Sequence, residues 1–251
     1  MDTIRELVKD YLAICKYQRR LNSKTIKAYQ IDLRQFCDYL ESKQMPISKK
    51  TLSSFIMEIN QVYQPLTVKR KIASLKAFFN HLERDDLLPD NPFHKLSMSM
   101  REPIRLPRTI PLRTIEGMLH TAYQRLRSDS PRQKQLAIKD IAVMEMLFAT
   151  GIRVSELCHL DINDVDLIDG NIYINGKGAK ERLIQIGNTE VLAILKQYSD
   201  QSSHSENCPA FFTNQRGSRL SEQSVRLILR RYEADTHVTP HMCCHFHGTS
   251  A

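Results

Sequence analysis

Apolar residues recur at helical spacing throughout the first ninety residues. One such stretch runs from about residue 4 to residue 17, and a second opens at Ser23, a residue type that caps helix N-termini. A third begins near Ser48 or Thr51, and a fourth opens at Thr67. No strand-type alternation interrupts these stretches. The pattern therefore predicts a four-helix unit of a size that folds alone.

The pattern changes after Leu88. Five prolines and several arginines fall between Leu88 and Pro111. Prolines at this density exclude a helix interior, because each lacks a backbone donor and clashes with the preceding turn. We therefore expect an extended linker over residues 101–111, between a helical domain at residues 1–100 and a second domain at residues 112–251.

The second part of the chain mixes two kinds of pattern. Helical spacing covers roughly residues 113–126, 134–150, 189–200 and 221–234. Between these helices, Asp169-Gly170 is a turn signal, Ile172 and Ile174 alternate with polar residues, and Gly176 opens a second turn. The expected fold class is mainly α: a four-helix N-terminal domain, then a mostly helical domain with a small antiparallel β-sheet or hairpin.

The composition of the chain indicates which class of molecule it binds. The net charge is +8 and the pI about 9.2, and the first hundred residues hold 17 Lys/Arg against 11 Asp/Glu. This excess favours a polyanionic partner, with a basic but merely solvated surface as the alternative. The sequence contains no run of about 18 apolar residues, so we expect no membrane span. The six scattered cysteines form no CxxC pair and read as reduced thiols, and no signal peptide is recognisable, so we expect a cytoplasmic protein.

The stretch FATGIRVSELCHLDINDVDL, residues 148–167, contains the first candidate for chemistry. Arg153 lies in a tight corner after Gly151, between the predicted end of one helix and the start of the next. An arginine held by such a corner can bind a phosphate with two parallel N–H donors. The alternative is that Arg153 pairs with Glu156 and merely closes the corner.

A second candidate is GKGAKERL, residues 176–183. Lys177 lies at a predicted hairpin turn between two glycines, where the backbone can approach a ligand closely. A lysine in that position can reach a nucleic-acid groove and give a proton to a leaving oxygen. The alternative is a solvated turn with Lys177, Lys180 and Arg182 on its rim.

A third candidate is FFTNQRGSRLSEQSVRLILRRY, residues 211–232. Arg216 and Arg219 flank a glycine, and the helix that follows carries Arg226 and Arg230. Phosphate contacts from a basic helix would position the protein on DNA without reading its sequence. A solvated helix face is the alternative.

The final candidate lies in TPHMCCHFHGTSA, residues 239–251. Thr239 can cap a helix that begins at Pro240, which would place His241 in a first turn that favours anions. The segment's histidines and cysteines also suggest zinc. Zinc sites, however, combine two separated ligand pairs, and here every candidate falls within seven residues. We therefore expect no metal site and no other cofactor.

The order and spacing of these stretches resemble the tyrosine recombinase (phage integrase) family, nearest to its Xer-type members. The resemblance covers almost the whole chain and includes KTIKAYQIDLRQFCDYL and LTVKRKIASLKAFFNHL in the first domain. It implies a SAM-like core-binding domain and a catalytic domain that clamp double-stranded DNA. In that family a tyrosine attacks the phosphodiester to form a 3′-phosphotyrosyl link, arginines neutralise the transition-state charge, and no metal is needed.

The resemblance also assigns roles to residues. Arg153 matches the first catalytic arginine, Glu156 the structural partner that follows it, Lys177 the hairpin lysine and His241 the histidine of the HxxR box. Cys244 stands where that box has its second arginine, and losing such a donor costs on the order of 3 kcal/mol at the transition state. The implied DNA-binding residues are Lys24, Lys27, Lys69, Arg70, Lys76, Lys180, Arg182, Arg216, Arg219, Arg226 and Arg230.

The family's nucleophilic tyrosine would fall beyond residue 251. We therefore expect a C-terminally truncated family member that binds DNA but does not cleave it alone. One alternative is a subunit that works only with full-length recombinase protomers. Another is a non-enzymatic DNA-binding protein that occupies a recombination site.

Overall fold

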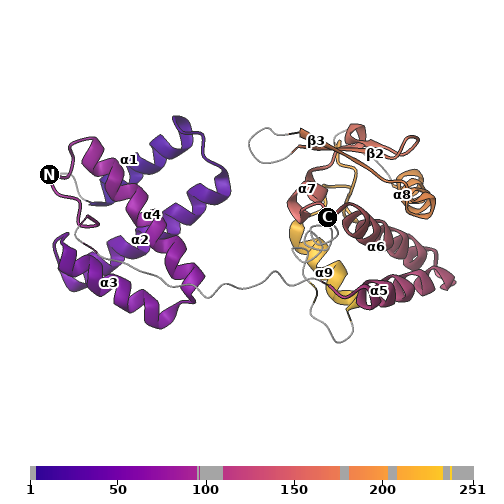
Figure 1. Cartoon of the computed structure of the whole chain (residues 1–251), viewed down its shortest axis with the longest axis horizontal. Coiled ribbons are helices and arrows are strands. Elements are labelled where there is room, and N and C mark those ends of the chain that lie inside the picture. Colours follow the sequence, from indigo (N-terminus) through magenta and orange to yellow (C-terminus); the bar gives the residue numbers. More distant parts are fainter. Residues whose placement is uncertain are drawn as a thin grey trace. The chain divides into compact units, whose positions relative to one another are not determined.

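The computed structural model describes residues 4–94, 96, 110–175, 181–202, 208–233 and 238 (Figure 1). The chain divides into two compact units, Met1–Ile104 and Arg105–Ala251, and each has its own hydrophobic core. Of the predicted linker over 101–111, only Ile110 and Pro111 belong to the described residues. Within the described ranges, no helix combines the length and the apolar character that a membrane crossing requires.

The first unit is the predicted set of four helices. They are α1 (Ile4–Tyr17), α2 (Ser23–Lys43), α3 (Lys49–Val62) and α4 (Pro65–Arg84). An aromatic cluster joins α2, α3 and α4, because the ring of Phe36 lies 5.1 Å from that of Phe55 and 5.8 Å from that of Phe79. All three side chains are at most 2% exposed. Burial of such large apolar side chains is the main stabilising contribution to a unit of this size.

The helix starts differ slightly from the sequence-based expectation. Asn22, not Ser23, caps α2, and its side-chain oxygen accepts a backbone N–H of the first turn at 2.8 Å. Ser48 caps α3 as expected. α4 begins at Pro65, ahead of Thr67, because proline suits a first helical turn in which backbone N–H groups have no intrahelical partner.

The second unit is built around one long helix. Its elements are α5 (Leu112–Gln124), η1 (Arg125–Arg127), α6 (Pro131–Thr150), α7 (Val154–His159), η2 (Ile162–Asp164), β1 (Val165–Asp166), β2 (Asn171–Asn175), β3 (Glu181–Gln185), α8 (Thr189–Gln201) and α9 (Glu222–Tyr232). α6 packs against α5, α8 and α9, and most of its second half is buried (Figure 1). A helix that is apolar on nearly all sides needs such neighbours.

The three strands form an antiparallel sheet in the order β1-β2-β3, which confirms the predicted small sheet. Ile172 pairs with Ile184, and Asn175 with Glu181. Gly170 has φ +73° in the turn before β2, and a Cβ there would lie 2.4 Å from the Ile186 carbonyl oxygen, so only glycine fits. The predicted second turn at Gly176 lies outside the described residues.

Candidate functional site

Arg153 is positioned by a tight turn at the end of α6. Gly151 ends that helix with φ +62°, and its N–H donates to the Leu147 carbonyl at 3.0 Å. Ile152 then inserts into the core with no exposed surface. Because Gly151 adopts a left-handed conformation and Ile152 is anchored, the chain reverses at once and presents Arg153 at the N-cap of α7.

Glu156 holds this corner closed. Its carboxylate accepts the Arg153 backbone N–H at 2.8 Å and the Arg153 Nη1 at 3.0 Å. The Glu156 side chain is 7% exposed, whereas that of Arg153 is 67% exposed. One edge of the guanidinium is therefore anchored, and the rest of the group faces solvent.

Arg182 brings the β-hairpin to the same carboxylate. From β3, its Nη1 lies 3.0 Å from Glu156 Oε1 and its Nη2 lies 2.7 Å from Glu156 Oε2. This bidentate geometry is the strongest form of an arginine–carboxylate pair. The hairpin and the Arg153 corner are thus tied together through Glu156. Lys177 and Lys180, which fall between β2 and β3 in the sequence, lie outside the described residues.

The two arginines keep Glu156 ionised. Burial by itself would raise the pKa of this carboxyl group, but the hydrogen bonds from Arg182 and Arg153 outweigh that effect and lower the pKa to about 2. At neutral pH the cluster therefore combines two guanidinium groups with one carboxylate. Its remaining positive charge and the exposed N–H groups of Arg153 suit an oxyanion such as a phosphodiester.

The other predicted arginines of the second unit have different surroundings. Arg219 donates Nη1 to the carbonyls of Cys158 and Leu160 at 3.1 and 3.3 Å and pairs Nη2 with Asp161 at 2.5 Å, so it fastens the end of α7. Arg226 pairs with Glu222 at 3.3 Å, one turn earlier on α9.

Arg216 and Arg230 are exposed, and within the described ranges neither forms an ion pair. They are therefore better placed than Arg219 for contacts with a ligand.

The predicted basic residues of the first unit also divide into two kinds. Lys24, Lys27, Lys69 and Lys76 are exposed on α2 and α4. Arg70 instead forms an ion pair with Asp32, whose side chain is fully buried. These residues belong to a separate unit from Arg153, so the structure groups them by helix and not into one site.

Sequence reasoning missed the network around Asp32. This carboxylate accepts hydrogen bonds from Lys71 Nζ at 3.2 Å and Ser74 Oγ at 2.7 Å, in addition to Arg70. The Lys71 side chain is only 5% exposed, and its ammonium also donates to Gln35 at 2.6 Å. The sequence did contain a signal that Asp32 is buried. Asp32 follows Tyr29 by three residues and precedes Phe36 by four, which places it on the apolar stripe of its helix.

His241 and Cys244 lie outside the described residues, as do the other candidates of the rejected zinc site. In the part of the chain that is described, no three histidine, cysteine, aspartate or glutamate side chains are grouped to hold a metal ion. Cys15, Cys37 and Cys158 are buried and Cys208 is partly exposed, and none of these four forms a disulfide.

Two family models match the chain. The phage integrase family matches residues 116–250, and the phage integrase N-terminal SAM-like domain matches residues 8–86. A tyrosine recombinase of Agathobacter rectalis is 46% identical over 257 residues, which cover 100% of this chain and 84% of that protein. Tyrosine recombinase XerC of Roseiflexus castenholzii is 31% identical over 256 residues, covering 96% of this chain and 79% of the relative.

Solved structures share the fold at lower identity. A lambda integrase tetramer bound to a Holliday junction has a TM-score of 0.67 at 17% identity and covers 98% of this chain and 72% of that one. The XerH site-specific recombinase bound to a palindromic difH substrate, in a post-cleavage complex, also has a TM-score of 0.67, at 19% identity, and covers 93% of this chain and 70% of that one. These structures show a shared fold, and the family models together with the 46% identical relative show that the chain belongs to the phage integrase family of tyrosine recombinases.

Proposed function

We propose that this chain binds double-stranded DNA and grips a phosphodiester with Arg153. The observation that carries the proposal is the Glu156 clamp, which fixes one edge of the Arg153 guanidinium and leaves the side chain 67% exposed. Two further groups, Lys177 in the hairpin and His241, complete the proposed phosphate contacts. Preorganised donors of this kind stabilise charge that develops on a phosphoryl group.

Basic residues outside the corner would hold the DNA backbone. Lys27 and Lys76 are exposed on α2 and α4, and Arg216 and Arg230 are exposed in the second unit. The lambda integrase and XerH structures are complexes with DNA, which supports DNA as the partner of this chain. Lambda integrase forms dimers and tetramers in its complexes, so further recombinase protomers are the proposed protein partners.

We further propose that the 251-residue chain does not cleave DNA on its own. Cys244 occupies the position at which the family pattern has its second arginine, and a thiol cannot supply a charged, bidentate contact to phosphate. The last tyrosine of the sequence, Tyr232, is 5% exposed and donates its hydroxyl proton to Asp140 at 3.0 Å. A hydroxyl buried and bonded in this way is not presented to a DNA strand.

Duplex binding tests the first proposal. We expect affinity for a duplex to fall at least tenfold between about 50 and 200 mM salt, because bound phosphates release counterions. Replacing Lys27 by Gln should weaken binding and reduce the salt slope by about one. The matched control is Lys43→Gln at the other end of α2, about 24 Å away along the helix, which should leave both quantities unchanged. Absence of duplex binding at low salt would contradict the proposal.

A nicked suicide substrate tests the second proposal. With the chain as the only protein, we expect no covalent protein–DNA adduct on a denaturing gel, because Cys244 replaces the second arginine and no tyrosine follows His241 in the sequence. A cleavage-competent recombinase of the same family, on its own substrate, serves as the positive control. A phosphotyrosyl adduct formed by this chain alone would show that the proposal is wrong.

A further inference from the structure

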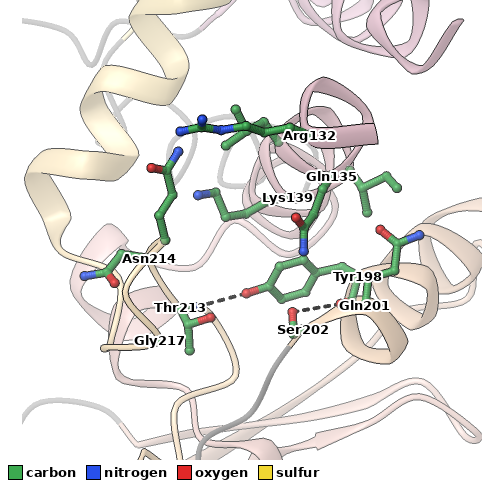
Figure 2. A pocket seen from close by; sticks show the side chains of 12 residues that line it. Arg132, Gln135, Lys139, Tyr198, Gln201, Ser202, Thr213, Asn214 and Gly217 are labelled. Atoms are coloured by element: carbon green, nitrogen blue, oxygen red, sulfur yellow. Dashed lines mark hydrogen bonds between the residues drawn. The ribbon is translucent and has the colours of Figure 1, made fainter. Parts of the chain in front are cut away.

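A cavity of about 390 Å³ lies beside α6, away from the Arg153 corner. It is lined by side chains from the first half of α6, the end of α8 and the turn at residues 213–217 (Figure 2). From Lys139 to the end of α6 at Gly151 the distance along the helix is about 18 Å. The cavity is therefore distinct from the proposed phosphodiester site, and its volume falls in the range of small-molecule sites.

The charge of the cavity is positive. Arg132 and Lys139 are its two charged lining residues, and both extend from α6 toward the 213–217 turn (Figure 2). Within the described ranges, neither side chain forms a hydrogen bond or an ion pair. Arg231 and Tyr232 both bind Oδ2 of the nearby Asp140 carboxylate, which does not line the cavity. Burial lowers the pKa of the half-buried Lys139 ammonium, and the nearby charge of Asp140, which acts in the opposite direction, does not reverse the shift.

Neutral polar side chains also line the cavity. The Tyr198 hydroxyl accepts the Thr213 backbone N–H at 2.9 Å, so its own proton remains to be donated, and Tyr198 is only 4% exposed (Figure 2). The side-chain oxygen of Asn214 accepts the backbone N–H groups of Arg216 and Ser218 at 2.8 and 3.2 Å, which leaves its NH₂ group as the free end. The hydrogen bonds that hold these two side chains in place therefore also orient their donors.

We propose that this cavity binds a small molecule that carries a phosphate group. Two unpaired cations, a buried hydroxyl and a carboxamide with its oxygen occupied form a donor set, and the cavity lining contains no carboxylate among the described residues. The phosphate would lie between Arg132 and Lys139, where charge-assisted hydrogen bonds are strongest. Leu136 and Ile138 line the same cavity and offer an apolar wall to the rest of the molecule. A DNA backbone phosphate has the same chemistry, so the experiment must separate the two sources.

Isothermal titration calorimetry of the full chain with ADP, at constant ionic strength, tests the proposal. We expect ADP to bind at up to millimolar concentration, whereas adenosine, which lacks the phosphates, does not. Lys139→Gln and Arg132→Gln should each weaken ADP binding about tenfold, the loss typical of one charge-assisted contact. Lys134→Gln is the matched control, because Lys134 is exposed on α6 and does not line the cavity. Arg132 is also exposed, so its replacement leaves the fold intact and keeps the test valid if Lys139→Gln misfolds.

No binding of ADP, equal binding of adenosine, or an equal loss of affinity in Lys134→Gln would each overturn the proposal. The affinity of each variant for a DNA duplex shows whether the bound phosphate belongs to a small molecule or to the DNA backbone. An unchanged duplex affinity in Lys139→Gln and Arg132→Gln supports a small ligand. A duplex affinity that falls in parallel with ADP binding would instead make the cavity a DNA backbone contact and end the small-molecule assignment.

Discussion

Replacing Asp32 by Ala is expected to lower the free energy of unfolding of the first unit by about 3–5 kcal/mol, the cost of breaking a buried ion pair by removing one partner. The Lys71 side chain, 5% exposed, would keep its charge in the core, where Gln35 and the Tyr63 ring are its remaining partners among the described residues. Arg70 is 44% exposed and can turn to water, so most of the cost arises at Lys71.

The measurement is the urea dependence of thiol labelling at Cys37, which is 1% exposed on α2 and reports unfolding of this unit. The double variant Asp32→Leu with Lys71→Met removes both charges and should recover most of the loss, because apolar side chains of similar size replace buried pairs at little cost. Glu41→Gln is the control, since it breaks an exposed pair with Arg5 and should change little. A double variant no more stable than Asp32→Ala would show that the Asp32 carboxylate stabilises the unit by some means other than pairing with Lys71.

The fold could be predicted from the sequence because its signals are local. Helical spacing identified all four helices of the first unit, and the Asp169-Gly170 turn with the alternation at Ile172 and Ile174 identified the sheet. These patterns depend on residues at most a few positions apart. The differences lie at helix boundaries: Asn22 caps α2 in place of Ser23, Pro65 begins α4 ahead of Thr67, and α9 ends at Tyr232 and not at residue 234.

The surroundings of the basic residues could not be predicted in the same way. Arg70 and Asp32 are 38 positions apart, and Arg182 and Glu156 are 26 apart, so each pair exists only once helices and strands are packed. Both arginines were expected to contact DNA as part of a basic surface. In the folded chain each has a carboxylate partner, and Arg219 binds carbonyl oxygens of the chain itself. Net charge indicates that cations are in excess, but tertiary contacts decide which ones remain available.

Both units therefore use a buried acid to fix basic side chains. Asp32 collects three donors from α4, and Glu156 collects donors from two segments, the α7 corner and β3. The two sites differ in the exposure of the cations that the acid holds. Around Asp32 one cation is itself buried, so the network mainly ties α4 to α2. Around Glu156 both arginines are partly exposed, at 67% and 40%, so the acid holds cations at the surface.

Replacing Glu156 by Gln is expected to lower the free energy of unfolding of the second unit by about 2–3 kcal/mol at pH 7, the value of hydrogen bonds to a charged group. The effect should depend on pH. The pKa of Glu156 is about 2 in the folded chain against an ordinary 4.5, so its stabilisation is complete well above pH 4.5 and is lost as the pH falls toward 2. Between pH 6 and pH 4 the original chain should lose about 1 kcal/mol more than the Gln variant.

Urea-dependent labelling of Cys158, 4% exposed and two residues after Glu156, reports unfolding of this corner at both pH values when a disulfide reagent active in acid is used. Glu181→Gln is the matched control, because it removes the same charge from an exposed position on β3, the strand that carries Arg182. It should leave the labelling profile nearly unchanged and preserve the pH dependence. If Glu156→Gln instead retained the full pH dependence of the original chain, the low pKa of Glu156 would not be the source of the acid sensitivity. The Glu156 clamp would then stabilise the corner through shape and neutral hydrogen bonding alone.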